Sequence, residues 1–385
     1  MQRIYLDNNA TTAIHPDVLD VLSESLRDVY GNASSIHKEG QRARQVIEDA
    51  RESVARLIGA TARDVVFTSG GTESNNAAIF GAVTHERRHH IVTTSIEHPS
   101  VAEAVKELER RGNRVTRVAP SRSGAVAPSD VIDAIESDTR LVTVMLANNE
   151  TGVIQPVPEI ARACRERGIH FHCDAVQAMG KIDVDVNALD CDTLSISAHK
   201  MHAPKGIGAL YVRRGLTLNA HIVGGAQERR RRAGTENVPL AAAFGAAAAI
   251  AADGSWRPRI AALRDRFESD LRTAFDVTIN GATATRVPTT TSATFAGVDA
   301  EGLVIALDLS GAAVSTGSAC SSGRVEPSAV LLAMGLPPEE AKSTIRFSMS
   351  RFTKEEEVER VMALLRELVP RCARGAAHFS APSAG

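Results

Sequence analysis

Strand-like and helix-like segments alternate along this chain from about residue 38 to residue 255. The first segment has apolar residues at three- and four-residue spacing between Ala43 and Ile58 and stops at Gly59, which predicts an amphipathic helix with a glycine terminator. Such alternation with short connections requires right-handed crossovers and a mostly parallel sheet covered on both faces. We therefore predict an α/β fold whose ligands bind beyond the carboxyl ends of the strands.

The same periodicity predicts the order of the elements. Helices are expected to begin at Asn76 and Ser129 and to cover residues 100–111, 158–167 and 239–252. A Pro/Gly turn after Lys200 leads into a further strand that ends at Val212. The other strands are predicted at residues 64–68, 90–94, 114–118, 140–146, 169–173 and 192–197.

A length of 385 residues exceeds what one hydrophobic core usually supports, so two domains are expected. The alternation breaks at residues 253–258, and the remainder mixes helices (259–273, 300–308, 327–334, 354–369) with strands (291–295, 344–348). We predict a large domain over residues 16–255. A smaller α+β domain would comprise residues 1–15 and 256–385.

The composition is that of an ordinary soluble protein, with 43% hydrophobic and 23% charged residues. A net charge of -2 provides no long-range attraction to nucleic acid or to an anionic membrane. Basic runs at residues 85–90 and 228–232 are therefore interpreted as solvated faces or subunit contacts. The N-terminus has no apolar signal region and no stretch is long enough to span a bilayer, so we predict a cytoplasmic protein.

Five cysteines, an odd number without paired spacing, argue against a disulfide framework or a zinc site, and we predict no metal. Cys164, Cys173 and Cys191 lie in apolar surroundings and are expected to be packed small hydrophobes. Cys320 differs, because it lies in a run of small residues (315–323) with nothing apolar to hold it in a core. We predict a mobile loop and a reactive thiol, which would need a nearby base or cation to form thiolate at neutral pH.

A lysine and an aspartate each follow a predicted strand. Lys200 comes after the strand at 192–197, and Asp174 ends the strand at 169–173, so both would leave the carboxyl edge of one sheet. A pyridoxal phosphate site is built in this way, with lysine for the aldehyde and carboxylate for the ring nitrogen. The alternative for Lys200 is a solvated loop cation.

The motif Ser-Gly-Gly-Thr-Glu-Ser-Asn-Asn at residues 69–76 follows a strand and opens a helix. Its backbone N–H groups and the positive helix end can hold an anion, so a phosphate cradle is one interpretation. An ordinary glycine-rich turn with a capping hydroxyl is the other. The motif is neither a P-loop nor a dinucleotide fingerprint, because the lysine and the third glycine are missing.

Three further polar groups follow or lie within strands. His98 could stack on a flat ring or move protons, or be a structural histidine. The residues around Asn149 offer amides at the same sheet edge, or form a turn. Arg346 lies mid-strand in an apolar setting and needs an anion, which is either a substrate carboxylate held bidentately or a buried acidic partner.

These motifs resemble those of cysteine desulfurases of the NifS/IscS type, class V aminotransferases among the fold-type I pyridoxal phosphate enzymes. The resemblance runs nearly end to end, from residues 5–12 and 31–37 to 343–352. Its most specific parts are the Ser-x-His-Lys lysine, the Asp-Ala-x-Gln segment and the Gly-Ser-Ala-Cys loop. It implies a large domain with a mostly parallel seven-stranded sheet flanked by helices, plus a smaller α+β domain.

The resemblance also implies roles for individual residues. Lys200 would bind the aldehyde of pyridoxal 5′-phosphate, Asp174 would pair with its ring nitrogen, and Gln177 would bond its phenolic oxygen. His98 would stack on the ring and assist proton transfers, while Asn149 and Arg346 would take the substrate carboxylate. The phosphate would be held by Gly71, Thr72, Ser197, His199 and, from the neighbouring subunit of a homodimer with shared active sites, Thr235.

The implied reaction converts L-cysteine to L-alanine and leaves a persulfide on Cys320. The long Gly/Ser-rich Cys320 loop then implies direct sulfur transfer to an acceptor protein such as an iron-sulfur scaffold. One departure is Ala203, at a position that is usually glycine in the family, which should reshape the turn only slightly. The alternatives are a selenocysteine lyase or aminotransferase with the same cofactor, and a sulfur carrier or scaffold-binding protein without turnover.

Overall fold

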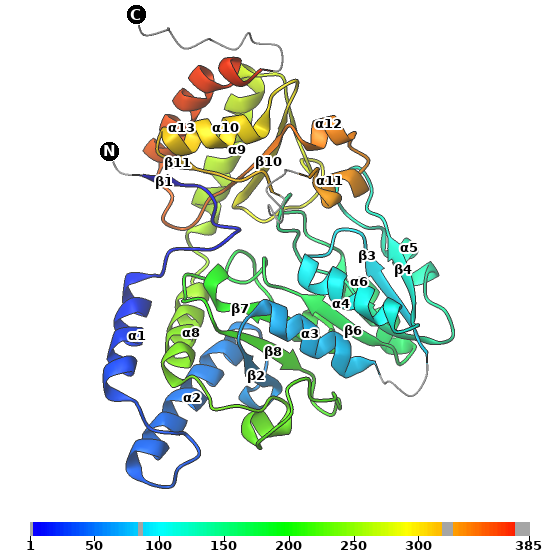
Figure 1. Ribbon diagram of the computed structural model, residues 1–385, viewed down its shortest axis with the longest axis vertical. Coiled ribbons are helices and arrows are strands. Elements are labelled where there is room, and N and C mark those ends of the chain that lie inside the picture. The colour runs from blue at the N-terminus through cyan, green and yellow to red at the C-terminus, as the bar shows by residue number, and fades with distance from the viewer. Residues whose placement is uncertain (1–2, 84–87, 318–325, 374–385) are drawn as a thin grey trace, which may run out of the picture.

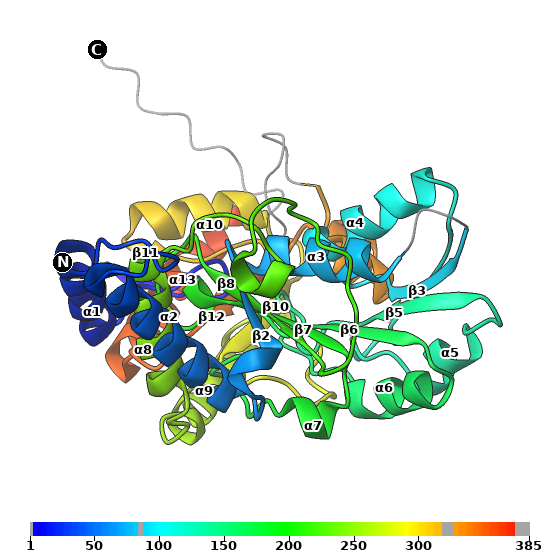
Figure 2. The same cartoon turned by 90° about the horizontal axis from the view of Figure 1, so that it is seen from below.

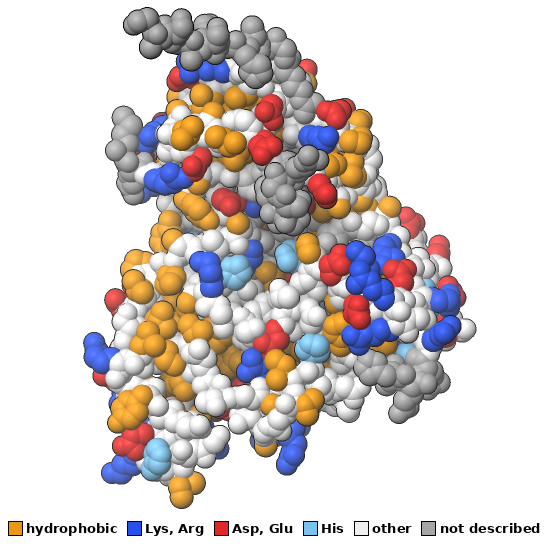
Figure 3. Space-filling model, in the orientation of Figure 1, with side chains coloured by type: hydrophobic (Ala, Val, Ile, Leu, Met, Phe, Trp, Pro, Cys, Tyr) orange, Lys and Arg blue, Asp and Glu red, His pale blue; other side chains and the backbone are white. Residues whose placement is uncertain are grey.

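The computed structural model describes residues 3–83, 88–317 and 326–373 of the chain. Figure 1 shows a lower body that contains a large twisted sheet and an upper body built around helices and smaller sheets. On the face seen in Figure 3, basic and acidic side chains lie interspersed, as the small net charge suggests. No helix in the described part of the chain combines the length and the apolar character needed to cross a bilayer.

The large sheet has seven strands in the order β2-β8-β7-β6-β5-β3-β4, which confirms the predicted mostly parallel sheet. The five strands from β7 to β4 run parallel, and β8 is antiparallel to both of its neighbours. Their carboxyl ends therefore meet along one edge. The strands are β2 (Val65–Thr68), β3 (His90–Thr94), β4 (Arg114–Val118), β5 (Thr139–Thr143), β6 (His170–Asp174), β7 (Thr193–Ser197) and β8 (Gly208–Val212).

Helices cover both faces of this sheet (Figure 2). On one face lie α3 (Gly71–Ala82) and α4 (Pro99–Arg110), and on the other α5 (Pro128–Asp133), α6 (Val157–Glu166) and α7 (Val186–Leu189). Three more helices pack together beside β2 (Figure 1). They are α1 (Pro16–Asp28), α2 (Lys38–Leu57) and α8 (Val238–Ala251).

Two boundaries differ by more than two residues from those expected. The helix α3 begins at Gly71 rather than Asn76, because the polar residues Thr72, Glu73 and Ser74 form its first turn directly after Gly70. The ladder of β5 ends at Thr143 rather than at residue 146, although Val144 and Leu146 still donate backbone hydrogen bonds to β6 carbonyls. The chain thus continues along the sheet edge into the polar segment that follows.

The upper body contains a three-stranded antiparallel sheet in the order β12-β10-β9 and a parallel pair β1-β11. A second apolar cluster joins Ile4 and Leu6 to side chains between Ile260 and Val369. This agrees with a small domain completed by the N-terminal segment, and we propose the division at residues 15/16 and 255/256. The elements are β1 (Ile4–Tyr5), β9 (Val277–Ile279), β10 (Thr290–Phe295), β11 (Ala312–Ala313), β12 (Thr344–Ser348), α9 (Arg257–Ala274), α10 (Ala300–Leu309), α11 (Ala329–Ala333), α12 (Pro338–Ala341) and α13 (Glu355–Leu368).

A buried ion pair ties α2 to β2 and to the segment before α8. Arg51 and Glu228 are 3% and 7% exposed and form a bidentate pair with N···O distances of 2.6 and 2.8 Å. Glu228 also accepts a hydrogen bond from the backbone N–H of Phe67. Removing one partner would leave the other as an unpaired charge in the interior.

We predict that Arg51→Met lowers the free energy of unfolding by about 3–5 kcal/mol. Lys106→Met is the matched control, since Lys106 forms an exposed pair with Glu103 that should contribute less than about 1 kcal/mol. Denaturant unfolding of both variants measures the difference. If both variants lost an equal, small part of their free energy of unfolding, the Arg51–Glu228 pair would not be what holds these elements together.

Candidate active site

A pocket of about 240 Å³ lies at the carboxyl ends of β7, β6, β5 and β3 and at the start of α3. The structure brings nine of the predicted site residues together there. Arg346 and Thr235 do not line this pocket, and Cys320 lies outside the described residues. The lining residues are Ala10, Gly71, Thr72, Asn75, His98, Ser100, Met145, Ala147, Asn149, Asp174, Val176, Gln177, Ser197, His199 and Lys200.

Lys200 ends the short 3-10 turn Ala198–Lys200 that follows β7. Its Nζ donates to the carbonyl of Ala10 at 2.8 Å and to that of Asn9. Burial, together with the positive charge of Arg346, lowers the pKa of this amine to about 8. Lys200 is therefore not a solvated loop cation but a held amine, partly neutral near physiological pH.

Asp174 is the last residue of β6 and is 5% exposed. Its Oδ1 accepts from the backbone N–H of Val176 at 2.9 Å and its Oδ2 from Nδ2 of Asn75 at 2.8 Å. Two N–H donors thus satisfy the buried carboxylate and fix its direction at the pocket wall. An acidic oxygen and a reactive amine consequently line the same pocket from adjacent strands.

The turn before α3 has the features of an anion cradle. Gly70 adopts φ 155° and ψ -177°, a conformation open essentially to glycine alone. It also lies against Gly208, where an added Cβ would come within 2.7 Å of the Gly70 backbone. No side chain caps the N-terminus of α3, so its first N–H groups remain available to an anion.

Hydroxyl and imidazole groups surround the same turn. Thr72 follows Gly71 in the first helical turn, and Ser197 lies across from Gly71, whose added Cβ would be 3.4 Å from the Ser197 Cβ. His199 Nδ1 is 3.1 Å from Oγ1 of Thr11. Burial and the neighbouring Lys200 lower the pKa of His199 to about 4, so it offers a hydrogen bond rather than a charge.

His98 is the N-cap residue of α4, where its Nδ1 accepts from the backbone N–H of Ser100 at 3.1 Å. That contact leaves Nε2 to carry the proton of the neutral ring. Desolvation in the pocket lowers the pKa of His98, and the charge of Lys200 lowers it further against the opposing effect of Asp174. His98 is therefore both a structural cap and a pocket residue.

Arg346 follows the second of its two predicted alternatives in this structure. It is 5% exposed and bonds to Oδ1 of Asp7 at 2.8 Å and to the carbonyl of Asn149 at 3.0 Å. Its Nε is buried and has no hydrogen-bond partner in the described part of the chain. One donor of the guanidinium thus remains uncommitted close to Asn149.

The sequence did not indicate that residues 7–12 form part of the site. Asn9 accepts through its carbonyl from Gln177 Nε2 at 2.8 Å as well as from Lys200. The side-chain oxygen of Asn9 accepts a hydrogen bond from Lys181, which also donates to Gln177 Oε1 at 2.6 Å. The side-chain NH2 of Asn9 donates to Thr290. The polar pair Asn8-Asn9 could have indicated this part of the site, because it directly follows the strand-like residues 4–6 and so lies at a strand end like the other candidates.

Thr235 lies in a separate hollow lined by Thr68, Ser69 and Gly206, among others. It is exposed there and is not among the residues that line the pocket around Lys200. Its predicted role toward the phosphate of a neighbouring subunit therefore stays a prediction. The three cysteines predicted to be packed hydrophobes, Cys164, Cys173 and Cys191, are buried as free thiols, which confirms that prediction.

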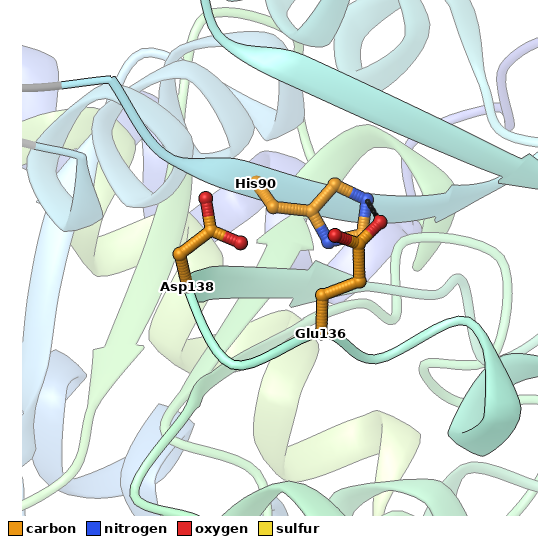
Figure 4. Close-up of side chains that lie close together, drawn as sticks. All are labelled: His90, Glu136 and Asp138. Atoms are coloured by element: carbon orange, nitrogen blue, oxygen red, sulfur yellow. Dashed lines mark ion pairs between the residues drawn. The ribbon is translucent and has the colours of Figure 1, made fainter.

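Figure 4 shows a second group of titratable side chains, His90, Glu136 and Asp138, at the amino end of β3. Arg114 already donates to both carboxylates, at 2.8 and 2.7 Å. Both ring nitrogens of His90 lie within 2.9 Å of threonine hydroxyls, those of Thr139 and Thr116. This group is an ion-pair network with its donors and acceptors already matched.

The comparison with known proteins agrees with this arrangement. The sequence model of the family described as aminotransferase class-V matches residues 4–361. Cysteine desulfurases from Nostoc sp. and Enterobacter agglomerans are 44% and 45% identical, each over 96% of this chain and 94% of the relative. A cysteine desulfurase IscS from Anaeromyxobacter dehalogenans is 46% identical over 95% of this chain and 92% of its own.

The chain belongs to the class-V aminotransferases, among the cysteine desulfurases of the NifS/IscS type. A solved NifS-like protein superposes with a TM-score of 0.90 at 34% identity, covering 96% of this chain and all (100%) of the other. A structure described as SspA in complex with cysteine has a TM-score of 0.81 at 34% identity, covering 91% and 100%. The predicted family and fold are thereby confirmed.

Glu97 lies directly before His98 and is 8% exposed. Its Oε1 accepts from Thr94 Oγ1 at 2.6 Å and from the backbone N–H of Met145 at 3.0 Å, while Oε2 has no partner in the described part of the chain. Burial raises the pKa of Glu97 to about 8. The folded protein therefore holds this carboxyl group protonated at neutral pH, whereas the unfolded chain ionises it.

We predict that Glu97 makes stability fall as pH rises, by up to roughly 1.4 kcal/mol per unit between about pH 5 and 8, whereas buried histidines such as His172 and His199, whose pKa values are lowered from 6.5, contribute the opposite slope at the acidic end of that range. Between its unfolded and folded pKa values, the carboxyl group of Glu97 binds up to one more proton in the folded state than in the unfolded state. Glu97→Gln should lose this falling contribution, so its stability relative to the wild type should increase as pH rises, and the exposed control Glu103→Gln should run parallel to the wild type. Urea unfolding at several pH values tests this, and parallel curves for all three proteins would contradict it.

Proposed function

We propose that this protein converts L-cysteine to L-alanine with pyridoxal 5′-phosphate and passes the sulfur to the thiol of Cys320. The observation that carries the proposal is that Lys200 and Asp174, from adjacent strand ends, line one pocket beside an uncapped helix N-terminus. An amine, a carboxylate and an anion cradle are the three groups that this cofactor requires. The names of the related desulfurases support the choice of cysteine as substrate.

The residues of the pocket suit the cofactor. Lys200 would hold the aldehyde, Asp174 the ring nitrogen and Gln177 the phenolic oxygen. The phosphate would bind at the turn of Gly71 and Thr72, with Ser197 and His199 beside it, and His98 would lie over the ring. When bound, pyridoxal phosphate supplies an aldehyde that joins an amine covalently and a ring that accepts electrons from the attached carbon.

The protein's own groups then bind the substrate and move its protons. Asn149, at the pocket wall, and Arg346, once its guanidinium turns from Asp7 toward the pocket, would take the substrate carboxylate. Lys200 Nζ, once released, is a base of suitably lowered pKa that can remove the proton from Cα. His98 can deliver a proton from Nε2, because its Nδ1 is engaged by the start of α4.

Sulfur transfer would occur at Cys320. Its thiolate forms an S–S bond with the substrate sulfur as the C–S bond breaks, and the electron pair stays on carbon, which takes up a proton to give alanine. The enzyme is left with a persulfide. We propose that an acceptor protein, such as an iron-sulfur scaffold, then collects this sulfur, and that the protein acts in the cytoplasm as a homodimer in which Thr235 reaches the partner's phosphate site.

We predict that the purified protein binds pyridoxal phosphate with visible absorption and releases alanine and sulfide from cysteine in the presence of a thiol. Cys320→Ser should lower the rate of alanine formation at least 100-fold while leaving the bound cofactor's spectrum unchanged. Cys372→Ser is the control, since this half-buried thiol lies away from the pocket and should leave the rate within twofold. Lys200→Ala should abolish turnover.

Assays with selenocysteine and with keto acids separate the alternatives. Turnover of selenocysteine alone, or amino transfer to a keto acid, would replace desulfurization as the activity. A protein that takes up no pyridoxal phosphate yet binds an iron-sulfur scaffold would instead be a sulfur carrier or a docking protein. An unchanged rate in Cys320→Ser would show that another group receives the sulfur.

A further inference from the structure

A chain of hydrogen bonds runs from Asp174 into the interior of the large sheet. Asn75 Nδ2 donates to Asp174 Oδ2 at 2.8 Å, and Asn75 Oδ1 lies 3.0 Å from His172 Nε2. His172 Nδ1 lies 3.0 Å from the hydroxyl of Thr193, which is 2.9 Å from His170 Nε2. Asn75, His172 and Thr193 are each 0% exposed, so water does not compete for these bonds.

The direction of donation along this series of hydrogen bonds is set by Asp174, at its active-site end. An ionised carboxylate can only accept, so Asn75 must turn its NH2 toward Asp174 and its oxygen toward His172. His172 must then carry its proton on Nε2, which leaves Nδ1 to accept from Thr193. Burial, with a smaller contribution from His170, lowers the pKa of His172 to about 3, in keeping with a neutral ring.

The arrangement follows from strand geometry. His172 and Asp174 are two residues apart on β6 and therefore point to the same face of the sheet, the face on which α3 presents Asn75. Packing alone would favour an apolar residue at a fully buried strand position. A histidine whose two nitrogens are both bonded, one of them toward an active-site carboxylate through one amide, is suited to orienting that carboxylate.

We propose that Asn75 and His172 are positioning residues that keep Asp174 ionised and aimed at the ring nitrogen of the cofactor. The proposal rests on the proposed function, because it assigns Asp174 to that nitrogen. N–H donors to a carboxylate stabilise its charged form, so the proton shared between carboxylate and ring stays on the ring. Without His172, the oxygen of Asn75 loses its buried donor and the amide is held only through its NH2, by Asp174 and Ser100, so its hydrogen bond to Asp174 weakens.

The test compares two histidines in similar surroundings. His90, drawn in Figure 4, is also 0% exposed on a strand of the same sheet, but its ring nitrogens contact the hydroxyls of Thr139 and Thr116 rather than Asn75. His172→Leu and His90→Leu should therefore lose comparable stability in thermal unfolding. Each holoenzyme is loaded with pyridoxal phosphate carrying ¹⁵N in the ring, and the ¹⁵N resonance is recorded against pH.

We expect the ¹⁵N resonance of His172→Leu to move toward that of an unprotonated ring, and kcat to fall about tenfold with KM within twofold. His90→Leu should match the wild type in resonance, and His172→Gln, which keeps a donor toward Asn75, should recover most of the signal. Asn75→Leu should reproduce His172→Leu. This variant keeps the proposal testable if His172→Leu does not fold.

Other outcomes separate the proposal from the function on which it rests. A wild-type spectrum without a bound ring resonance would overturn the proposed function itself. A normal wild-type spectrum with identical resonances in His172→Leu, Asn75→Leu and His90→Leu would overturn only the positioning role. Equal shifts in His172→Leu and His90→Leu would do the same, because they would reflect general loosening of the sheet.

Discussion

The hydrogen bonds of Asn9 hold this site together. Through its carbonyl and side chain, Asn9 contacts Lys200, Gln177 and Lys181 below the boundary between the two bodies and Thr290 above it. These bonds place the amine of Lys200 beside the segment that reaches the small sheet. The pocket therefore depends on the N-terminal segment, although most of its lining comes from the carboxyl edge of the large sheet.

Burial shifts the pKa values of several groups in and around this pocket. It lowers the pKa of Lys200 to about 8 and keeps His199 uncharged, whereas it raises that of Glu97 to about 8. Lys181 lies deeper still, bonded to two amide oxygens, and its pKa is lowered well below the usual value. Each of these shifts costs stability, because the group is held in the protonation state that water would not favour at the same pH.

The sequence predicted the features that arise from local periodicity and strand ends. Lys200, Asp174 and the turn at Gly71 could be found because each follows an apolar run. The pairings of Asn9 with Lys200, of Asn75 with Asp174 and of Asp7 with Arg346 could not, because each joins distant segments and depends on tertiary packing rather than on local pattern. Arg346 shows the limit clearly: its need for an anion was readable from the sequence, but the choice of Asp7 was not.

The account depends on a covalent bond between Lys200 and pyridoxal phosphate, and borohydride reduction of the cofactor-loaded protein tests that bond directly. Reduction, digestion and mass analysis should place a pyridoxyl group on the peptide that contains Lys200. A pyridoxyl group on another lysine, such as Lys181, or on none would contradict the central claim.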